Sequence, residues 1–265
     1  CTCNTFAAKV SGRTVIWGKY NHVSKNLLLD DLEHIYTNDY AFAGIRKNGT
    51  VVTWGSPDSG CDSSLVDLQD IDKIYSTNTT FAAIRKDGSV VTWGDTYNGG
   101  NSHDVQTQLH DVVTIASTGY AFAAITREGR VVTWGEARSG GDSQSVQHQL
   151  KGVEQIYATS QAFAVKLFNG SVVVWGNQWF GGYLQGLREV DIIFTNGYAF
   201  AAFQNFGLNG RVVTWGAPEY GGDSNSVQDQ LVDVDTIYST TQAFAAVLRN
   251  GRIVTWGTPE YGGDS

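Results

Sequence analysis

The 265-residue sequence contains no methionine, only three prolines and three cysteines, and no long apolar run. Because no apolar stretch approaches the roughly 18 residues that a membrane span needs, we expect a soluble chain without direct membrane insertion. The cysteines, at positions 1, 3 and 61, are odd in number and lack metal-binding spacing, so they neither require nor exclude an oxidising compartment. The missing initiator methionine predicts a piece processed or trimmed from a longer precursor, and an exported or organellar location stays open.

Basic residues are also scarce. The chain has 18 Lys and Arg against 26 Asp and Glu, for a formal net charge of −8. The basic residues are scattered along the sequence and form no stripe that could neutralise phosphates. This acidic balance argues against nucleic acid and anionic membranes as partners.

The chain is rich in repeats of a Trp-Gly step, which occurs seven times with successive spacings of 37, 39, 41, 41, 40 and 41 residues. A period near 40 with strand-forming content predicts a propeller or a solenoid. We expect residues 1–265 to form a single domain of seven repeats, with the first and last incomplete. The tryptophans of the step are Trp17, Trp54, Trp93, Trp134, Trp175, Trp215 and Trp256.

The pattern of each repeat predicts a β-hairpin preceded by one more strand. In residues 80–94 two strand-forming runs flank Asp87-Gly88, a pair that favours a type I′ hairpin turn. Residues 73–76 form the preceding strand, and residues 227–231 are typical of a possible fourth strand in their repeat. The pattern therefore predicts an all-β protein whose alanines are spacers between sheets and whose repeated tryptophans are buried core.

The repeated x-Asp-Gly-x-Val-x-x-Trp-Gly pattern, followed by a Gly-rich loop, resembles the RCC1-like repeat family over essentially the whole chain. The resemblance implies a seven-bladed RCC1-like β-propeller with about 41 residues per blade. Gly-Gly-Asp-Ser, as at residues 221–224, replaces the family's usual Gly-Gln-Leu-Gly. The short unit looks more like the RCC1-type inhibitors of β-lactamase and like algal repeat arrays labelled HECT-and-RCC1, but the absence of a HECT domain removes any basis for ligase chemistry.

No catalytic motif accompanies the repeats. The five histidines occupy non-equivalent repeat positions, and none of the Gly-rich loops has the spacing of a phosphate-binding loop. The acids that follow the paired glycines or Gly-Cys could form a calcium ring, but an Asp at this place is more simply a turn residue. We therefore expect no enzyme activity, no cofactor and no metal. These acids are Asp62, Asp142, Asp223 and Asp264.

Aromatic residues outside the core gather on the loops at one end of the repeats. These loops follow Trp-Gly or precede the Ala-Phe-Ala-Ala strand, and strand direction places both at the end opposite the Asp-Gly turns. Tyr and Trp on loops are typical of protein-binding hot spots, although each ring could instead pack on its own loop. The candidate partner-binding residues are Trp179, Phe180, Tyr183, Tyr198, Tyr220, Tyr261, Tyr20, Tyr40, Tyr97 and Tyr120.

The fifth repeat departs most from the pattern. Phe200 follows Trp175 by 25 residues, whereas Phe163 follows Trp134 by 29, and residues 177–180 read Asn-Gln-Trp-Phe. The next hairpin is three residues longer than the others, which inserts Phe206 and Leu208. We expect Trp179 and Phe180 to be exposed in the isolated domain and to contact a partner.

These observations favour a non-catalytic protein-interaction module or scaffold subunit, whose partner is another protein or a multi-subunit complex. A carbohydrate-binding propeller is one alternative, and it would require aromatic site residues that repeat in every blade. A regulator resembling a guanine-nucleotide exchange factor is the other, implied by the family likeness alone. The use of the glycosylation sequons at Asn48, Asn78 and Asn169 stays open.

Overall fold

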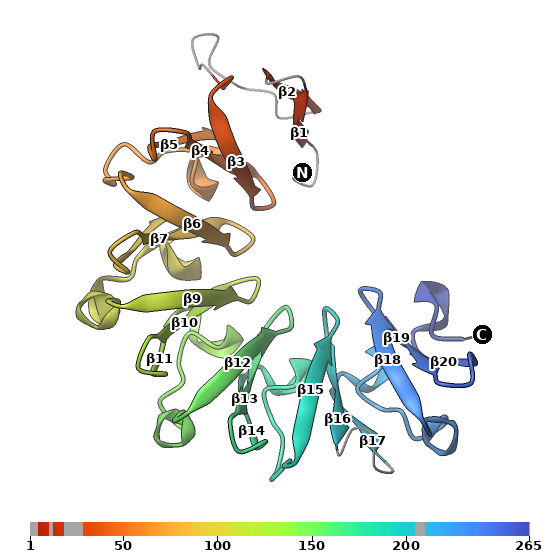
Figure 1. The fold of residues 1–265 in the computed structure, drawn as a ribbon. Helices are drawn as coiled ribbons and strands as arrows, with labels where there is room; N and C mark the ends of the chain where they lie inside the picture. Colours follow the sequence, from red (N-terminus) through yellow and green to blue (C-terminus); the bar gives the residue numbers. More distant parts are fainter. Residues whose placement is uncertain (1–4, 11–12, 19–28, 205–209, 265) are drawn as a thin grey trace. The chain divides into compact units, whose positions relative to one another are not determined.

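The computed structural model describes residues 5–10, 13–18, 29–204 and 210–264 (Figure 1). They form one two-stranded and six three-stranded antiparallel sheets, which we number blades 1 to 7 in chain order. The chain divides into two compact units: unit one comprises residues 1–128 and 132–136, and unit two comprises residues 129–131 and 137–265. Tyr20, Phe206 and Leu208 lie outside the described residues, as do Cys1 and Cys3.

Blade 1 consists of β1 (Thr5–Val10) and β2 (Arg13–Gly18), and every later blade has three strands. The blades that begin in unit one are β3 (Leu32–Thr37), β4 (Ala41–Arg46) and β5 (Val51–Gly55); β6 (Ile71–Ser76), β7 (Thr80–Arg85) and β8 (Val90–Gly94); and β9 (Val112–Ser117), β10 (Ala121–Thr126) and β11 (Val131–Gly135). The blades of unit two are β12 (Val153–Ala158), β13 (Ala162–Leu167) and β14 (Val172–Gly176); β15 (Val190–Thr195), β16 (Ala199–Gln204) and β17 (Arg211–Gly216); and β18 (Val234–Ser239), β19 (Ala243–Leu248) and β20 (Ile253–Gly257).

The loops that follow the Trp-Gly steps carry short helical turns. None of the helices formed by the described residues is long and apolar enough to cross a membrane. The turns are η1 (Pro57–Ser59), η2 (Thr96–Gly100), η3 (His103–Gln108), η4 (Ala137–Ser139), η5 (Gln147–Gln149), η6 (Gln178–Phe180), η7 (Pro218–Tyr220), η8 (Gln228–Gln230) and η9 (Pro259–Tyr261).

The hairpin turns differ from the type I′ prediction. Gly88 has φ +81° and its amide donates to Arg85 O at 2.8 Å, whereas Asp87 is not among the residues with positive φ. Because type I′ needs positive φ at both central residues, this is instead a three-residue loop, a type I turn closed by a left-handed glycine. The Asp87 carboxylate accepts hydrogen bonds from the Ser89 amide at 2.9 Å and hydroxyl at 2.7 Å. That side chain stabilises the longer turn, and the two hydrogen bonds lower the pKa of Asp87.

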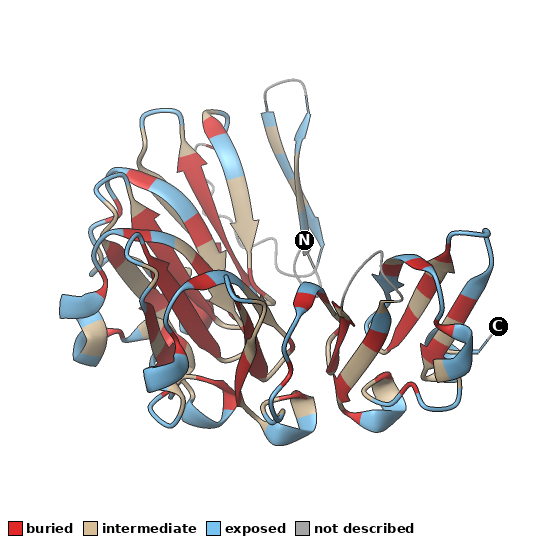
Figure 2. Cartoon of the chain, turned by 60° about the horizontal axis from the view of Figure 1, so that its bottom comes forward, coloured by how far each residue is buried: buried red, intermediate tan, exposed pale blue. Residues whose placement is uncertain are grey.

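The middle strand of each three-stranded blade is largely buried, and Figure 2 shows such strands in red. In blade 3, Phe81 lies directly opposite Trp93 across β7 and β8, and their rings stack with centroids 5.3 Å apart. Both side chains are almost fully buried. The alternation of Phe and Ala along β7 therefore places a large ring on one face of the sheet and a small methyl on the other.

The two faces of neighbouring blades complement each other. In unit one, Ala41 and Ala43 of blade 2 pack in one cluster with Phe81 and Trp93 of blade 3. Small side chains let the sheets approach, and the aromatic pair of the next blade fills the space. In unit two, the alanines of blade 6 and the Phe-Trp pair of blade 7 repeat this arrangement.

The glycine after each short turn closes this interface. Gly60 has φ +97°, and a Cβ atom built on it would lie 2.9 Å from Phe81 Cδ2. The Trp93 indole Nε1 donates to Gly60 O at 3.0 Å. Position 60 therefore requires glycine both for its backbone conformation and for the close approach of the ring.

The expectation of seven buried tryptophans is confirmed for six of them and wrong for Trp17. The six later tryptophans are 2% to 5% exposed, whereas Trp17 is 48% exposed. Trp17 still stacks on Phe6, with centroids 5.6 Å apart. Within unit one, no described glycine loop packs on this stack as Gly60 packs on Phe81.

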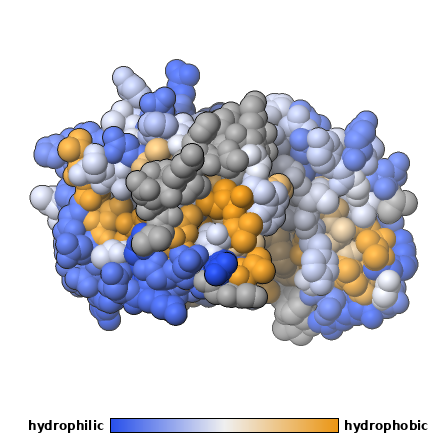
Figure 3. All heavy atoms as spheres, turned by 90° about the horizontal axis from the view of Figure 1, so that it is seen from above, coloured by the Kyte–Doolittle hydropathy of each residue, from blue (hydrophilic) through white to orange (hydrophobic). Residues whose placement is uncertain are grey.

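Blade 7 also has an exposed apolar side chain. The face of blade 7 that corresponds to the alanine face of blade 2 carries Ile253, which is 58% exposed. Figure 3 shows apolar side chains gathered over this blade, at the right of the view.

A fourth strand at residues 227–231 is a wrong prediction. Gln228–Gln230 form a 3-10 turn that runs along the edge of blade 6. The Gln228 side-chain Nε2 donates to Val212 O at 3.1 Å, and its Oε1 accepts from Ser224 Oγ at 2.9 Å. The edge of the sheet is thus capped by a side-chain amide instead of by another strand.

Candidate functional site

Hydrogen bonds bring two kinds of loop together at one end of each blade, which we call the loop end. In unit two the Thr159 hydroxyl donates to Phe180 O at 2.9 Å, and the Asn196 side-chain amide donates to Tyr220 O at 2.7 Å. Each bond joins the turn before a middle strand to the loop after Trp-Gly. The Asp-Gly hairpin turns lie at the other end of the strands, which we call the turn end.

Three predicted aromatic residues meet at the loop end of unit two. Phe180 stacks on Tyr198 with centroids 5.3 Å apart and 27° between the ring planes. Tyr198 in turn contacts Tyr220, with centroids 4.5 Å apart and a tilt of 45°. Loops from blades 5 and 6 thus contribute to one aromatic cluster, defined here as Phe180, Tyr198 and Tyr220.

Local hydrogen bonds hold this cluster in place. Asn196 Oδ1 accepts from the amides of Tyr198 at 2.8 Å and Ala199 at 2.7 Å. Asn177 Oδ1 accepts from the Trp179 amide at 3.0 Å, and its Nδ2 donates to Gln161 Oε1 at 2.7 Å. Because Asn caps the short turn that carries Trp179, the sequence Asn-Gln-Trp-Phe fixes the direction in which the two aromatic residues project.

Trp179 and Phe180 differ in exposure. Trp179 is 51% exposed, as expected. Phe180 is only partly exposed, because one side of its ring packs against the buried cluster of blades 5 and 6 and the other side lies against Tyr198. The expectation of an exposed pair therefore holds for Trp179 and is wrong for Phe180, which links the loop to the core.

The other candidates are spread over separate loops. Tyr97 is 85% exposed, Tyr183 58% and Tyr261 48%. Tyr183 accepts a short hydrogen bond from the Gln185 side chain on the same loop. Among the described residues of unit two, no ring contact joins Tyr183 or Tyr261 to the aromatic cluster. In unit one, Tyr40 is exposed and Tyr120 is partly buried.

The loop after blade 5, which carries Trp179, lacks a hydrogen bond to the next blade that the equivalent loops after blades 4 and 6 have. Trp175 Nε1 donates to Gly140 O at 2.9 Å and Trp256 Nε1 to Gly221 O at 3.1 Å. Trp215 is buried at the equivalent place against Gly181, yet its Nε1 has no hydrogen-bond partner in the described structure. The loop that carries Trp179 therefore lacks an anchor that its counterparts have.

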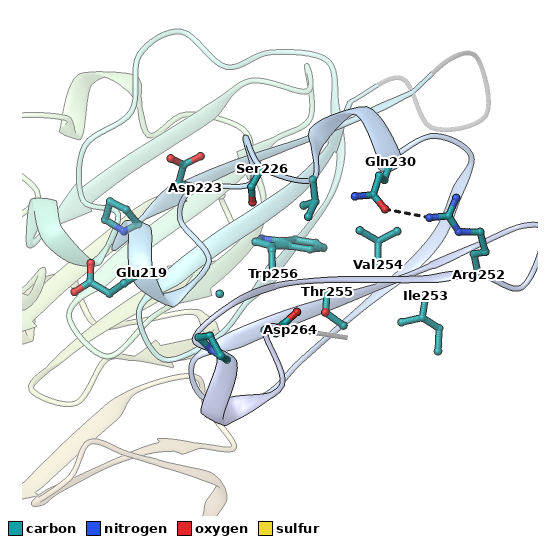
Figure 4. Close-up of a pocket in the computed structure, with 15 residues that line it drawn as sticks. Glu219, Asp223, Ser226, Gln230, Arg252, Ile253, Val254, Thr255, Trp256 and Asp264 are labelled. Carbon is teal, nitrogen blue, oxygen red and sulfur yellow. Dashed lines mark hydrogen bonds between the residues drawn. The ribbon is translucent and has the colours of Figure 1, made fainter.

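A groove of unit two lies between the loop after blade 6 and the outer strand of blade 7 (Figure 4). It has a volume of about 620 Å³ and is lined by the carboxylates of Glu219, Asp223 and Asp264. At its turn end Arg252 donates to Gln230 Oε1 at 3.0 Å.

The equivalent groove between the loops after blades 4 and 5 has a different lining. It has about 540 Å³, with Arg138 at the place of Glu219 and Tyr183 at the place of Asp264. The two grooves are formed by equivalent backbone segments of different repeats, but their lining side chains differ in charge.

The aspartates that follow Gly-Gly or Gly-Cys stabilise local turns of the backbone through their side chains. The carboxylates of Asp142 and Asp223 accept from the amides two residues later, both at 2.8 Å. Asp62 accepts from the Ser64 amide and hydroxyl, and these bonds lower the pKa of Asp62. In the part of the chain that the structure describes, no group of three or more His, Cys, Asp or Glu is placed to hold a metal ion.

No protein-family model matches the chain, and no curated protein matches it in sequence. Two solved structures of the yeast protein RCC1, also called Prp20, are similar to it in fold. One, from a study of Prp20p of Saccharomyces cerevisiae and its binding to Gsp1p and histones, has a TM-score of 0.50 at 14% identity, covering 86% of this chain and 72% of that one. The other, yeast RCC1 with Kap60, has a TM-score of 0.51 at 13% identity, covering 88% and 71%.

The ectodomain of the receptor kinase CR4 from the moss Physcomitrella patens is a further neighbour. It has a TM-score of 0.48 at 16% identity, and the match covers 81% of this chain but only 60% of the ectodomain.

The chain has the fold of an all-β RCC1-like propeller with seven blades. The seven antiparallel sheets and the likeness to Prp20 establish this architecture.

Sequence reasoning missed the acidic groove, although the signal was present. Glu219 and Glu260 occupy the same position of consecutive Pro-Glu-Tyr turns, where the loop after blade 4 has Arg138. Aligning the repeats by charge would have revealed the difference.

Proposed function

We propose that this chain is a non-catalytic protein-interaction module of the RCC1-like repeat family, acting within a larger assembly. Its partner contacts the loop end of unit two through Trp179 and the aromatic cluster, and the exposed Tyr183 and Tyr261 of the same unit extend the contact. The observation that carries the proposal is the stacking of Phe180, Tyr198 and Tyr220, which come from two successive blades.

Physical chemistry supports this surface as a contact site. Tyrosine and tryptophan bury large areas with little loss of conformational entropy, and their polar atoms can bond across an interface. The cluster is held by side-chain hydrogen bonds before any partner arrives, which lowers the cost of ordering the loops on binding. Prp20 binds the proteins Gsp1p and histones, and this supports, by analogy of fold alone, a protein as the partner here.

Site-specific cross-linking tests the proposal. A photoreactive phenylalanine analogue replaces Trp179 in one variant and Phe168 in the other, and the tagged chains are irradiated in extracts of the source organism. Phe168 is a matched control because it is 77% exposed but lies in the hairpin turn at the turn end.

We expect a discrete cross-linked protein from position 179 and none from position 168. Equal labelling from both positions, or a product from position 168 alone, would contradict the proposal. A carbohydrate-binding role would instead give glycan-array binding that is lost with Trp179→Ala, without any protein adduct.

A further inference from the structure

Charge is distributed unevenly along each blade. Among the described residues, Arg138 is the one Lys or Arg at the loop end, and every other described Lys or Arg lies in the half of its blade that carries the hairpin turns. The basic residues are scattered in the sequence because every repeat carries two to four of them, but in each blade the fold places almost all of the described ones at one end of the strands.

Several cations at the turn end are paired with nearby acids. In unit one, the Arg46 guanidinium forms a short ion pair with Asp31. In unit two, Lys166 Nζ lies 2.9 Å from Glu154 Oε1 and donates to Asp191 O, also at 2.9 Å. These cations are thus compensated by acids close to them in the fold.

Two glutamates at the loop end of unit two have no such ion pair within the described residues. Glu219 and Glu260 in unit two are exposed, and neither has an ion pair or a hydrogen bond to its carboxylate within the described residues. Glu219 adjoins Tyr220 of the aromatic cluster and lines the same groove as Asp223 and Asp264. The exposed Glu219 therefore lies at the same end of unit two as the aromatic cluster and directly precedes one of its rings in the sequence.

We propose that this surface binds a cationic polypeptide segment of the partner, with Lys or Arg side chains over the rings of Trp179 and Tyr220 and paired to Glu219. This inference rests on the proposed function and names the chemistry of its partner. An ammonium or guanidinium group is attracted both to the face of an aromatic ring and to a carboxylate, and the stems of these side chains pack on apolar surface.

The loop after blade 5 differs from its counterparts beneath the surface as well. Trp215 Nε1 has no hydrogen-bond partner in the described structure, so this loop lacks the indole hydrogen bond that the loops after blades 4 and 6 accept. The groove at Arg138 offers the contrasting surface on the same unit, because a cation replaces Glu219 there.

Peptide binding to the whole chain tests this proposal. The probe is a short fluorescent peptide of alternating Arg and Ser, and its counterparts carry Glu or Gln in place of Arg. Fluorescence anisotropy is measured at physiological salt, where long-range attraction to the net negative charge is screened.

Two double variants separate site binding from attraction to overall charge. Glu219→Gln with Glu260→Gln changes the loop end, and Asp72→Asn with Asp235→Asn removes the same two charges from exposed positions in the other half of the blades. We expect the loop-end pair to weaken binding of the Arg peptide by about tenfold and Trp179→Ala to weaken it by a similar factor. The Asp72, Asp235 pair should change it less than about twofold.

Equal weakening by the two double variants, or tighter binding of the Glu peptide, would overturn the cationic-partner inference. That failure is distinct from failure of the proposed function. Cross-linking from position 179 to a protein, together with no selectivity for the Arg peptide, would retain the interaction module and reject the cationic segment.

Discussion

The first hairpin and the third blade of unit one carry the same aromatic pair in different surroundings. Phe6 and Trp17 stack at 5.6 Å, and Phe81 and Trp93 stack at 5.3 Å. Yet Trp17 is 48% exposed and Trp93 only 3%. The hairpin register alone creates the stack, whereas its burial depends on the glycine loop of the preceding blade.

The largest expected effect is at Trp93. Trp93→Ala removes a buried indole, leaves a cavity between blades 2 and 3 and deprives Gly60 O of its donor. We expect a loss of about 3–5 kcal/mol in the free energy of unfolding, measured by urea denaturation. A loss below about 1 kcal/mol would show that the interface tolerates an empty indole site.

Gly60→Ala should cause the second-largest loss in the free energy of unfolding. The methyl group would approach Phe81 Cδ2 to 2.9 Å and would force a non-glycine residue to φ +97°. We expect a loss of about 2–3 kcal/mol in the same assay. Ser64→Ala, on the exposed part of the same loop, is the matched control and should cost less than Gly60→Ala.

Trp17→Ala should cost less than Trp93→Ala. Because nearly half of the Trp17 side chain already contacts solvent, truncation gives up about 1–2 kcal/mol of apolar burial. Equal losses at positions 17 and 93 would mean that Trp17 is buried in solution by a surface outside the described contacts, and the comparison would then fail.

A smaller effect is expected at the sheet edge. Gln228→Ala removes the amide that caps Val212 O and accepts from Ser224, so unfolding should become easier by about 1 kcal/mol. Gln230→Ala in the same turn is the control, since its contact is to the exposed Arg252 side chain. Thermal denaturation of the two variants should rank them in this order.

Trp179→Ala should have the smallest effect on stability. Its side chain is 51% exposed and makes no ring contact among the described residues, so the change should stay within about 0.5 kcal/mol. A loss above about 2 kcal/mol would assign Trp179 to the scaffold, contrary to its proposed role in binding.

The core formed by the repeats was predictable because every repeat places the same residue types at the same positions. Phe and Trp recur at fixed distances from a left-handed glycine, and period-2 alternation in Ala-Phe-Ala-Ala assigns each side chain to one face. The Trp-Gly count therefore gave the number of blades, and the strand order gave the two ends of each blade. Trp17 was misassigned because burial depends on a neighbour that no local pattern describes.

Turn type and edge structure were less predictable. Asp87-Gly88 suits both a two-residue and a three-residue hairpin loop, and the choice depends on strand register, to which the Asp side chain contributes by bonding Ser89. Gln228 lies in a segment with strand-like spacing, but its amide caps the edge in place of a strand. The stacking of Phe180 on Tyr198 depends on how loops of two blades meet, which no single repeat specifies.

We propose that the buried tryptophans of the Trp-Gly steps stabilise the fold, while the loop end of unit two makes the functional contact. Hydrogen–deuterium exchange on the complex that the tagged, unmodified chain forms in its source organism tests this most directly. The account predicts that the partner slows exchange in residues 177–183, 196–199 and 218–221 and leaves the hairpin turns at 168–171 and 249–252 unchanged. Protection of those hairpin turns, with the loop-end segments exchanging as in the free chain, would contradict it.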